Sequence, residues 1–194
     1  MKRLLLFSFG FLWPVSLLAD FQTGVDAYNR GDYATAYREF LPLAKQGDAK
    51  AQYNLGWIYY NGKGVPRDYA EAIKWYRLVA EQGLAEAQNN LGVMYDNGLG
   101  VPQDYAEAVR WYRLAAEQGY ALAQYNLGLM YGKGRGGPRD YVQAYAWTNL
   151  AALQGKKNVE KFRDTVERGM TSAKVAEAEK LSKEILERIK AKQP

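Results

Sequence analysis

The stretch Ala51–Gly83, AQYNLGWIYYNGKGVPRDYAEAIKWYRLVAEQG, decides the fold of this 194-residue chain, because two further copies of it follow directly. A fixed period in this range is typical of stacked repeat arrays, since one unit cannot bury its own apolar face. The sequence therefore predicts an array in which each unit packs against its neighbours. The copies are 36 residues apart, as three sets of shared positions show: Gly56, Gly92 and Gly128; Asp68, Asp104 and Asp140; Gly83, Gly119 and Gly155.

Each full unit is predicted to contain two antiparallel helices joined by a glycine-rich turn. The first helix, Asp48 to Asn61 in the first copy, carries apolar residues at the three-and-four spacing of an amphipathic helix. The turns NGKGVPRD, NGLGVPQD and GKGRGGPRD combine glycines, which accept positive φ, with a proline that cannot continue a helix. Gly83 is expected in the left-handed conformation that ends the second helix.

The second helix of each unit opens on an aspartate that is followed three residues later by Glu or Gln, as in Asp68 and Glu71. This spacing predicts a capping box. The aspartate accepts hydrogen bonds from the exposed backbone N–H groups, and the Glu or Gln side chain reaches back to the N–H of the aspartate. The start of the second helix is thereby defined in all three units.

The chain begins with the layout of a secretory signal peptide. Lys2 and Arg3 precede an uncharged run from Leu4 to Leu18, and we expect cleavage after Ala19. The run is shorter than the roughly 20 residues that span a bilayer, and Pro14 interrupts it, so a retained transmembrane helix is the less favoured alternative. The expected location is the bacterial periplasm or the medium, with no transmembrane segment after cleavage.

The repeats lie between two atypical segments. A first unit precedes them but lacks four residues of its turn, since Gly24 precedes Ala36 by 12 residues whereas later units have 16 at this place. After Gly155 the period fails, and two amphipathic helices, the second capped by Thr171, are predicted to cover the last repeat. A basic tail that binds a membrane or a partner is the alternative. The predicted domains are the signal peptide (1–19), a shortened repeat (20–50), three 36-residue repeats (51–155) and capping helices (156–194).

Composition argues against catalysis. The chain has no cysteine and no histidine, which excludes disulfides, thiolate nucleophiles, thiolate or imidazole metal sites and imidazole acid–base chemistry. Ser172 and Ser182 are the only serines after the leader, and no histidine is available to activate them. The recurring aspartates are explained as caps and are one repeat apart, too far for a carboxylate pair. We therefore predict a non-enzyme without cofactor or metal.

The net charge of +5 does not indicate nucleic-acid binding. The excess comes mostly from the leader and from the residues after Gly155, so the repeats are close to neutral. Charges of both signs alternate along the predicted helix surfaces, which is typical of a solvated face and unlike a stripe that follows phosphates. No nucleic-acid partner is expected.

The repeated unit resembles the Sel1-like repeat (SLR) family, a relative of the tetratricopeptide repeats. The resemblance lies in four motifs, which follow one another in the order A-x-x-x-L-G-x-x-Y, G-x-G-V-P-x-D-Y-x-x-A, W-Y and A-x-x-x-G. The resemblance covers Ala51 to Gly155 strongly and Phe21 to Lys50 in a shortened form, and the tail with Met170 and Thr171 looks like that of exported bacterial members. It implies an all-α fold, an α/α right-handed superhelix or solenoid of helix-turn-helix repeats. Some cysteine-rich exported relatives are associated with penicillin binding and β-lactam hydrolysis, but this chain lacks their cysteine pairs.

The resemblance also implies where a partner binds, namely on the concave side of the first helices. Aromatic and amide groups of this kind suit a protein segment, a peptide or a glycan better than a phosphate. In the alternative interpretation Tyr53 and Trp57 only pack between helices, and Asn54, Asn90 and Asn126 satisfy backbone groups at the hairpins. The predicted partner-facing residues are Tyr53, Trp57, Tyr60, Asn61, Asn89, Val93, Asp96, Asn97, Tyr125 and Leu129.

Two functions follow as expectations. The first is an exported scaffold that binds a partner protein or peptide on its concave face. The second is an envelope enzyme or carbohydrate-handling factor that acts on peptidoglycan, in the manner of the β-lactam-hydrolysing relatives. The absence of histidine and cysteine favours the scaffold.

Overall fold

The computed structural model describes residues 20–155 and 159–192, and every helix or strand assigned within these ranges is an α-helix. The expected signal peptide, residues 1–19, lies outside the described residues and stays a prediction. Within the described ranges, no helix combines the length and apolar character needed to cross a bilayer. The helices are α1 (Phe21–Asn29), α2 (Tyr33–Lys45), α3 (Ala49–Asn61), α4 (Tyr69–Glu81), α5 (Ala85–Asn97), α6 (Tyr105–Ala116), α7 (Ala121–Lys133), α8 (Tyr141–Leu153), α9 (Val159–Arg168) and α10 (Ser172–Ala191).

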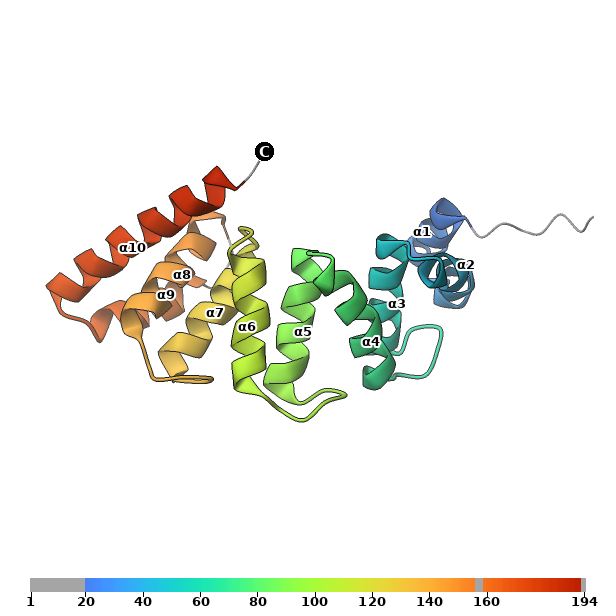
Figure 1. Ribbon diagram of the computed structural model, residues 1–194, viewed down its shortest axis with the longest axis horizontal. Helices are drawn as coiled ribbons and strands as arrows, with labels where there is room; N and C mark the ends of the chain where they lie inside the picture. The colour runs from blue at the N-terminus through green and yellow to red at the C-terminus, as the bar shows by residue number, and fades with distance from the viewer. Residues whose placement is uncertain (1–19, 156–158, 193–194) are drawn as a thin grey trace, which may run out of the picture.

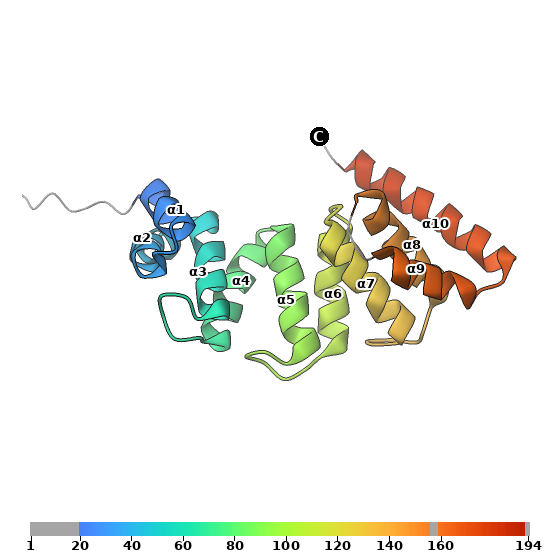
Figure 2. The same cartoon turned by 180° about the vertical axis from the view of Figure 1, so that it is seen from behind.

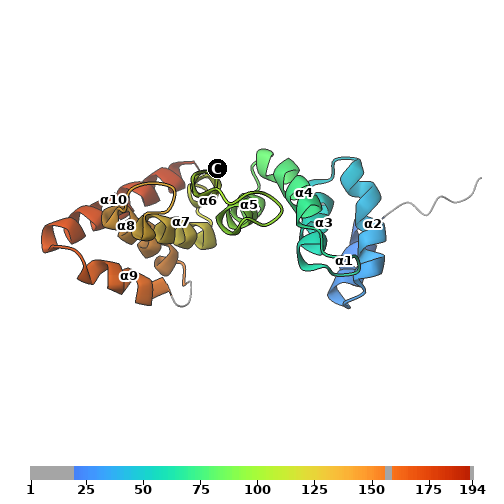
Figure 3. The same cartoon turned by 90° about the horizontal axis from the view of Figure 1, so that it is seen from below.

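The helices form a curved row of antiparallel hairpins, seen from one side in Figure 1 and from behind in Figure 2. The extensive contacts join helices that are adjacent in the chain, together with α8 and α10. Viewed from below, α1, α3, α5, α7 and α9 lie along the inner side of the arc and the even-numbered helices along the outer side (Figure 3). The predicted all-α solenoid is confirmed, and the first helix of each unit faces the inner curve.

In three units a glycine of the first helix faces an aromatic ring of the second helix, whereas Gly128 of the last unit faces the methyl group of Thr148. A Cβ on Gly92 would lie 2.5 Å from Cδ1 of Tyr112, and a Cβ on Gly56 would lie 2.7 Å from Cδ1 of Tyr76. Both rings are buried, and Phe40 makes the same contact in the shortened first unit. A glycine inside a helix costs about 1 kcal/mol relative to alanine, so the close packing of the two helices outweighs that cost.

The predicted aspartate caps are confirmed, but the reciprocal half of the capping box is wrong. Asp68 Oδ1 accepts a hydrogen bond from the backbone N–H of Glu71 at 3.0 Å, and the same bond recurs in the next two units. The backbone N–H of Asp68 donates instead to the carbonyl oxygen of Tyr59, 3.0 Å away on α3. Because the preceding helix supplies this acceptor, Glu71 turns away and pairs with Lys74.

A row of buried glutamines, not anticipated from the sequence, links successive hairpins. Gln88 is 4 % exposed; its Nε2 donates to the carbonyl of Ala80 at 3.0 Å, and its Oε1 accepts from Nε2 of Gln118 at 2.8 Å. The same arrangement recurs at Gln52 and Gln124. Each buried amide therefore joins the helix before it to the helix after it, and the hairpins are held by these bonds and by apolar packing.

The described part of the array ends in α9 and α10, which both pack against α8. Ile185 and Ile189 of α10 are buried, as their spacing predicted, and Ser182 Oγ accepts a hydrogen bond from Asn149 Nδ2 at 3.1 Å. The end of α10 also reaches the end of α6, where Lys192 lies 3.5 Å from Glu117. The terminal helix thus covers the outer side of the last repeat.

Candidate functional site

A cavity of about 340 Å³ lies on the inner side of the arc, between α3 and α5. None of the side chains that line it is ionised at neutral pH, and the set is aromatic, amide and aliphatic. The volume falls within the range of about 300–1,000 Å³ that is usual for ligand sites. The lining residues are Tyr53, Trp57, Tyr60, Asn61, Tyr76, Asn89, Asn90, Val93 and Leu122, and we refer to this as the inner cavity.

The tyrosines of the inner cavity are held by edge and tilted ring contacts. The rings of Tyr53 and Tyr76 are 5.6 Å apart between centroids, and those of Tyr60 and Tyr69 are 5.5 Å apart. Burial raises the pKa of Tyr53 and of Tyr60 above the usual value, so both hydroxyls stay neutral and keep their proton over the physiological pH range. They can therefore donate as well as accept hydrogen bonds to a ligand.

Trp57 serves packing and also lines the cavity. Its ring contacts those of Tyr28 and Tyr33, with centroids 4.9 and 5.8 Å apart, and it packs against the apolar clusters on both sides of α3. The side chain is half-buried. Trp57 therefore does pack between helices, because its ring lies against two rings of the shortened first unit. It does not only pack, since its remaining surface lines the inner cavity.

The asparagines of the inner helices present acceptors more than donors. Asn61 Nδ2 donates to the carbonyl of Trp57 at 2.9 Å, and Asn97 Nδ2 donates to the carbonyl of Val93 at 2.8 Å. Each of these bonds uses the Nδ2 group of the side chain and stays within one helix. The carbonyl oxygens of both side chains form no hydrogen bond within the described residues. They are therefore available to accept from the N–H groups of an extended peptide backbone.

Amide groups also bridge successive units across the inner side. Asn126 Nδ2 donates to Oδ1 of Asn89 at 3.0 Å, and Asn90 Nδ2 lies 3.5 Å from the hydroxyl of Tyr53, a long contact. The interpretation that Asn90 and Asn126 satisfy backbone groups is wrong, because their partners are side chains of the preceding unit. Asn89 is only 1 % exposed, so it forms the floor of the cavity.

The structure brings six of the ten predicted residues to the inner cavity and places the other four elsewhere. Asp96 forms an ion pair with Arg135 of the next unit at 3.4 Å, and Asn97 is exposed. Leu129 is half-buried. Tyr125, at the place of Tyr53 two units later, packs edge-on against Phe162 of α9, with centroids 6.5 Å apart. In the last unit, the ring of Phe162 from α9 therefore lies against the residue that corresponds to Tyr53.

Three lining residues were not predicted. Tyr76 reaches the cavity from α4, because the absent side chain of Gly56 lets its ring lie against α3. Asn90 was assigned to the hairpin, although its recurrence at three sites was a usable signal. Leu122 belongs to α7, a full unit further on, and only the curvature of the array brings it to this place.

The inner cavity offers no group suited to acid–base or nucleophilic chemistry. Its hydroxyls are phenols with a raised pKa, which disfavours their ionised, nucleophilic form. Ser182 is buried against Asn149, and Ser172 lies at the exposed start of α10, so neither reaches the cavity. Within residues 20–155 and 159–192, no group of three or more acidic side chains is arranged to hold a metal ion. The arrangement is suited to binding.

Comparison with known families gives a match over more than half of the chain. The family model of the Sel1 repeat matches three tandem segments, residues 49–84, 85–120 and 121–156. These segments contain α3 to α8 and therefore all the helices that line the inner cavity.

The fold is similar to that of two solved bacterial structures. The first is c5321, a protective antigen of uropathogenic Escherichia coli strains that displays an SLR fold; it is 32 % identical with a TM-score of 0.75, over 86 % of this chain and 40 % of that one. The second is a Sel1 repeat protein from Oxalobacter formigenes, 35 % identical with a TM-score of 0.69, over 74 % of this chain and 59 % of that one. This chain thus spans less than two thirds of either structure.

A shorter similarity extends to two mammalian proteins. The DAP3-binding cell death enhancer 1 of rat and that of mouse are each 42 % identical over 45 residues, which is 23 % of this chain and 9 % of theirs. The match is longer than one repeat unit and shorter than two.

Proposed function

This chain belongs to the Sel1 repeat family, and we propose that it is an exported scaffold protein that binds an extended, uncharged segment of a partner protein in the inner cavity. Proteins built from Sel1 repeats generally mediate protein–protein interactions, and the scaffold is generally non-enzymatic.

The observation that supports it is the chemistry of the inner cavity. Tyr53, Trp57 and Tyr60 supply aromatic surface at low entropic cost, and such residues dominate the energy of protein interfaces. Asn61 keeps a carbonyl oxygen that can accept from a peptide N–H, as described above. Because the lining carries no charge, a lysine or glutamate entering it would lose hydration without gaining a partner. An apolar or aromatic side chain flanked by free backbone groups suits the site best.

Export is the second part of the proposal. It is supported by the basic start and uncharged run of residues 1–19. The similarity to a protective antigen of a bacterium is consistent with a protein exposed outside the cytoplasm. We therefore propose a periplasmic or secreted location. Fractionation of cells that express the full chain, with the size of the mature product read by mass spectrometry, tests both the export and the cleavage after Ala19.

The binding proposal is tested by selecting random linear peptides, displayed on phage, against the purified protein. Val93→Glu places a carboxylate in the uncharged cavity, and Tyr60→Ala removes an aromatic wall without adding charge. Selected peptides should lose at least about tenfold in affinity for both variants. Leu114→Glu is the matched control, because Leu114 is 40 % exposed on the outer helix α6 and should leave affinity unchanged.

Equal affinity of the selected peptides for Val93→Glu, Tyr60→Ala and the parent protein would refute the assignment of the cavity. The enzymatic alternative is examined with the same preparation, by incubation with a fluorescent β-lactam and with purified sacculi. Turnover or covalent labelling would overturn the scaffold proposal. Retention on sacculi that Tyr60→Ala abolishes would instead identify a glycan as the ligand of the inner cavity.

A further inference from the structure

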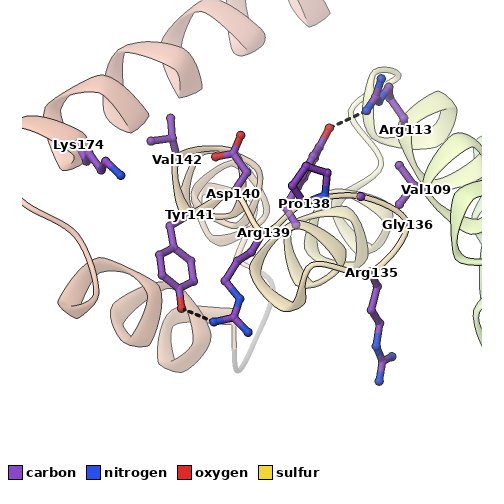
Figure 4. Close-up of a pocket in the computed structure, with 12 residues that line it drawn as sticks. Val109, Arg113, Arg135, Gly136, Pro138, Arg139, Asp140, Tyr141, Val142 and Lys174 are labelled. Atoms are coloured by element: carbon purple, nitrogen blue, oxygen red, sulfur yellow. Dashed lines mark hydrogen bonds between the residues drawn. The ribbon is translucent and has the colours of Figure 1, made fainter.

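A second cavity, of about 610 Å³, lies at the turn between α7 and α8, away from the inner cavity. It is bounded by α6, by the turn itself, by the start of α8 and by the start of α10 (Figure 4). We refer to it as the turn cavity. Its lining residues are Val109, Arg113, Tyr131, Arg135, Gly136, Gly137, Pro138, Arg139, Asp140, Tyr141, Val142 and Lys174.

The turn cavity is larger than the cavity of about 480 Å³ beside the preceding turn, and one valine of the repeat pattern is missing from it. The first and second full units have Val65 and Val101 before the proline of the turn, and both valines pack against the apolar clusters. The third unit has Gly137 at this place, and a Cβ there would meet nothing within 4 Å. The backbone does not require glycine at this position, because the φ angle of Gly137 is not in the positive range that favours glycine. The substitution leaves space where the other turns place an apolar side chain.

The same turn has gained positive charge relative to the turn before it. Arg135 and Arg139 stand where the second unit has Leu99 and Gln103. Arg135 is engaged in its ion pair with Asp96 and extends away from the other cations in Figure 4. Arg139 remains beside the cavity. This turn therefore differs in charge from the turn directly before it, whereas the turn of the first full unit carries Lys63 and Arg67 at the same two places.

Three cations of the turn cavity have no acidic partner in the described part of the chain. Arg113, Arg139 and Lys174 form none of its ion pairs. The only carboxylate of the lining, that of Asp140, accepts from the backbone N–H of Gln143 as the cap of α8. The lining thus carries an uncompensated positive charge, which favours an anionic ligand.

Two of the cations are held in position by tyrosine hydroxyls. Arg113 donates to the hydroxyl of Tyr131 at 2.6 Å, and Arg139 donates to that of Tyr141 at 3.3 Å. A neutral hydroxyl orients each guanidinium but leaves its charge uncompensated and several N–H donors unused. Arg113 and Lys174 lie on opposite sides of the cavity, and Arg139 lies beside Tyr141 (Figure 4). A ligand with more than one anionic group matches this spacing better than a single ion.

We propose that the turn cavity binds a small ligand that carries two or more carboxylate or phosphate groups. Arg113 and Arg139 form charge-assisted hydrogen bonds to its anionic oxygens, Lys174 contributes a third charge, and Val109 and Val142 contact its carbon skeleton. This site is independent of the inner cavity, because no residue lines both.

A cavity beside the turn of the preceding unit provides the comparison. It measures about 480 Å³ and is lined by Arg77, which donates to the hydroxyl of Tyr95 at 2.7 Å as Arg113 does to Tyr131. There, however, Val101 is retained at the place that Gly137 has in the third unit. Arg77→Gln therefore removes the same kind of arginine and the same tyrosine contact, and it should leave binding at the turn cavity unchanged.

The test is isothermal titration calorimetry of the purified protein with citrate and with inorganic pyrophosphate, which distinguish a carboxylate site from a phosphate site. At least one probe should bind saturably with a one-to-one stoichiometry, and more weakly as salt is added. Arg113→Gln and Arg139→Gln should each weaken it by about tenfold or more. Gly137→Val, which restores the missing valine without changing the charge, should weaken binding as well.

Circular dichroism melts of all variants establish that the array is intact. Absence of saturable binding by both probes would overturn the proposal, as would a loss of affinity in Arg77→Gln as large as that in Arg113→Gln. Unchanged affinity in Gly137→Val would show that the ligand does not occupy the space left by the missing valine, and would overturn the assignment to this cavity.

Discussion

Replacing Gly92 by alanine tests the packing that holds each hairpin together. The added Cβ would lie 2.5 Å from two ring atoms of Tyr112, closer than any ordinary contact, and the ring is itself 2 % exposed. Overpacking of this kind costs about 1–3 kcal/mol, because the ring must shift into a filled interior. Against this stands a gain of up to about 1 kcal/mol from placing alanine in a helix in place of glycine. We expect a net destabilisation of about 1–2 kcal/mol.

The measurement is thermal unfolding followed by circular dichroism at the helical band. For a chain of this length, 1 kcal/mol corresponds to a change of about 2–4 °C in Tm, so Gly92→Ala should lower Tm by about 2–8 °C. The control is the same substitution in a Tyr112→Ala background. With the ring removed, only the helix propensity remains, and Gly92→Ala should become neutral or stabilising. An unchanged or raised Tm in the single variant, or equal effects in both backgrounds, would refute the packing argument.

Three further predictions concern the joints of the array and its buried phenols. Gln88→Met keeps the volume of the side chain but removes its hydrogen bonds to Ala80 and Gln118. The free energy of unfolding in urea should therefore fall by about 1–3 kcal/mol. If the side chain of Gln88 only touched solvent, the substitution would cause no measurable change. Asp104→Ala removes the cap of α6 and should cost about 1 kcal/mol, which Asp104→Asn should largely restore. Burial raises the pKa of Tyr76 and of Tyr112 above the usual 10, so these phenols ionise first in the unfolded chain. Their contribution to stability should be constant below about pH 10 and be lost above it, with tyrosinate absorbance rising as the helices melt. Full tyrosinate absorbance at high pH in a protein that still keeps its helical signal would contradict this.

Much of the site was predictable because the first helix of each unit is recognisable from the period alone. Tyr53, Trp57 and Tyr60 lie four and three residues apart and therefore on one face of that helix, which the solenoid turns toward its inner curve. The functions of individual asparagines were not predictable. Asn61 bonds within its own helix whereas Asn126 bonds to the preceding unit, and no local signal distinguishes the two.

The repeat, the ends of the helices and the class of the fold can be read from the order of the amino acids alone. These follow from signals that act within a few residues: apolar spacing, aspartates at helix starts and glycines at helix ends. Contacts between units could not be read in this way: Asn89 forms the floor of a cavity, Leu122 reaches it from the next unit, and Lys174 of α10 stands beside the turn cavity. Such contacts join residues a repeat or more apart, so they depend on the angle between successive hairpins, which packing sets and local preference does not.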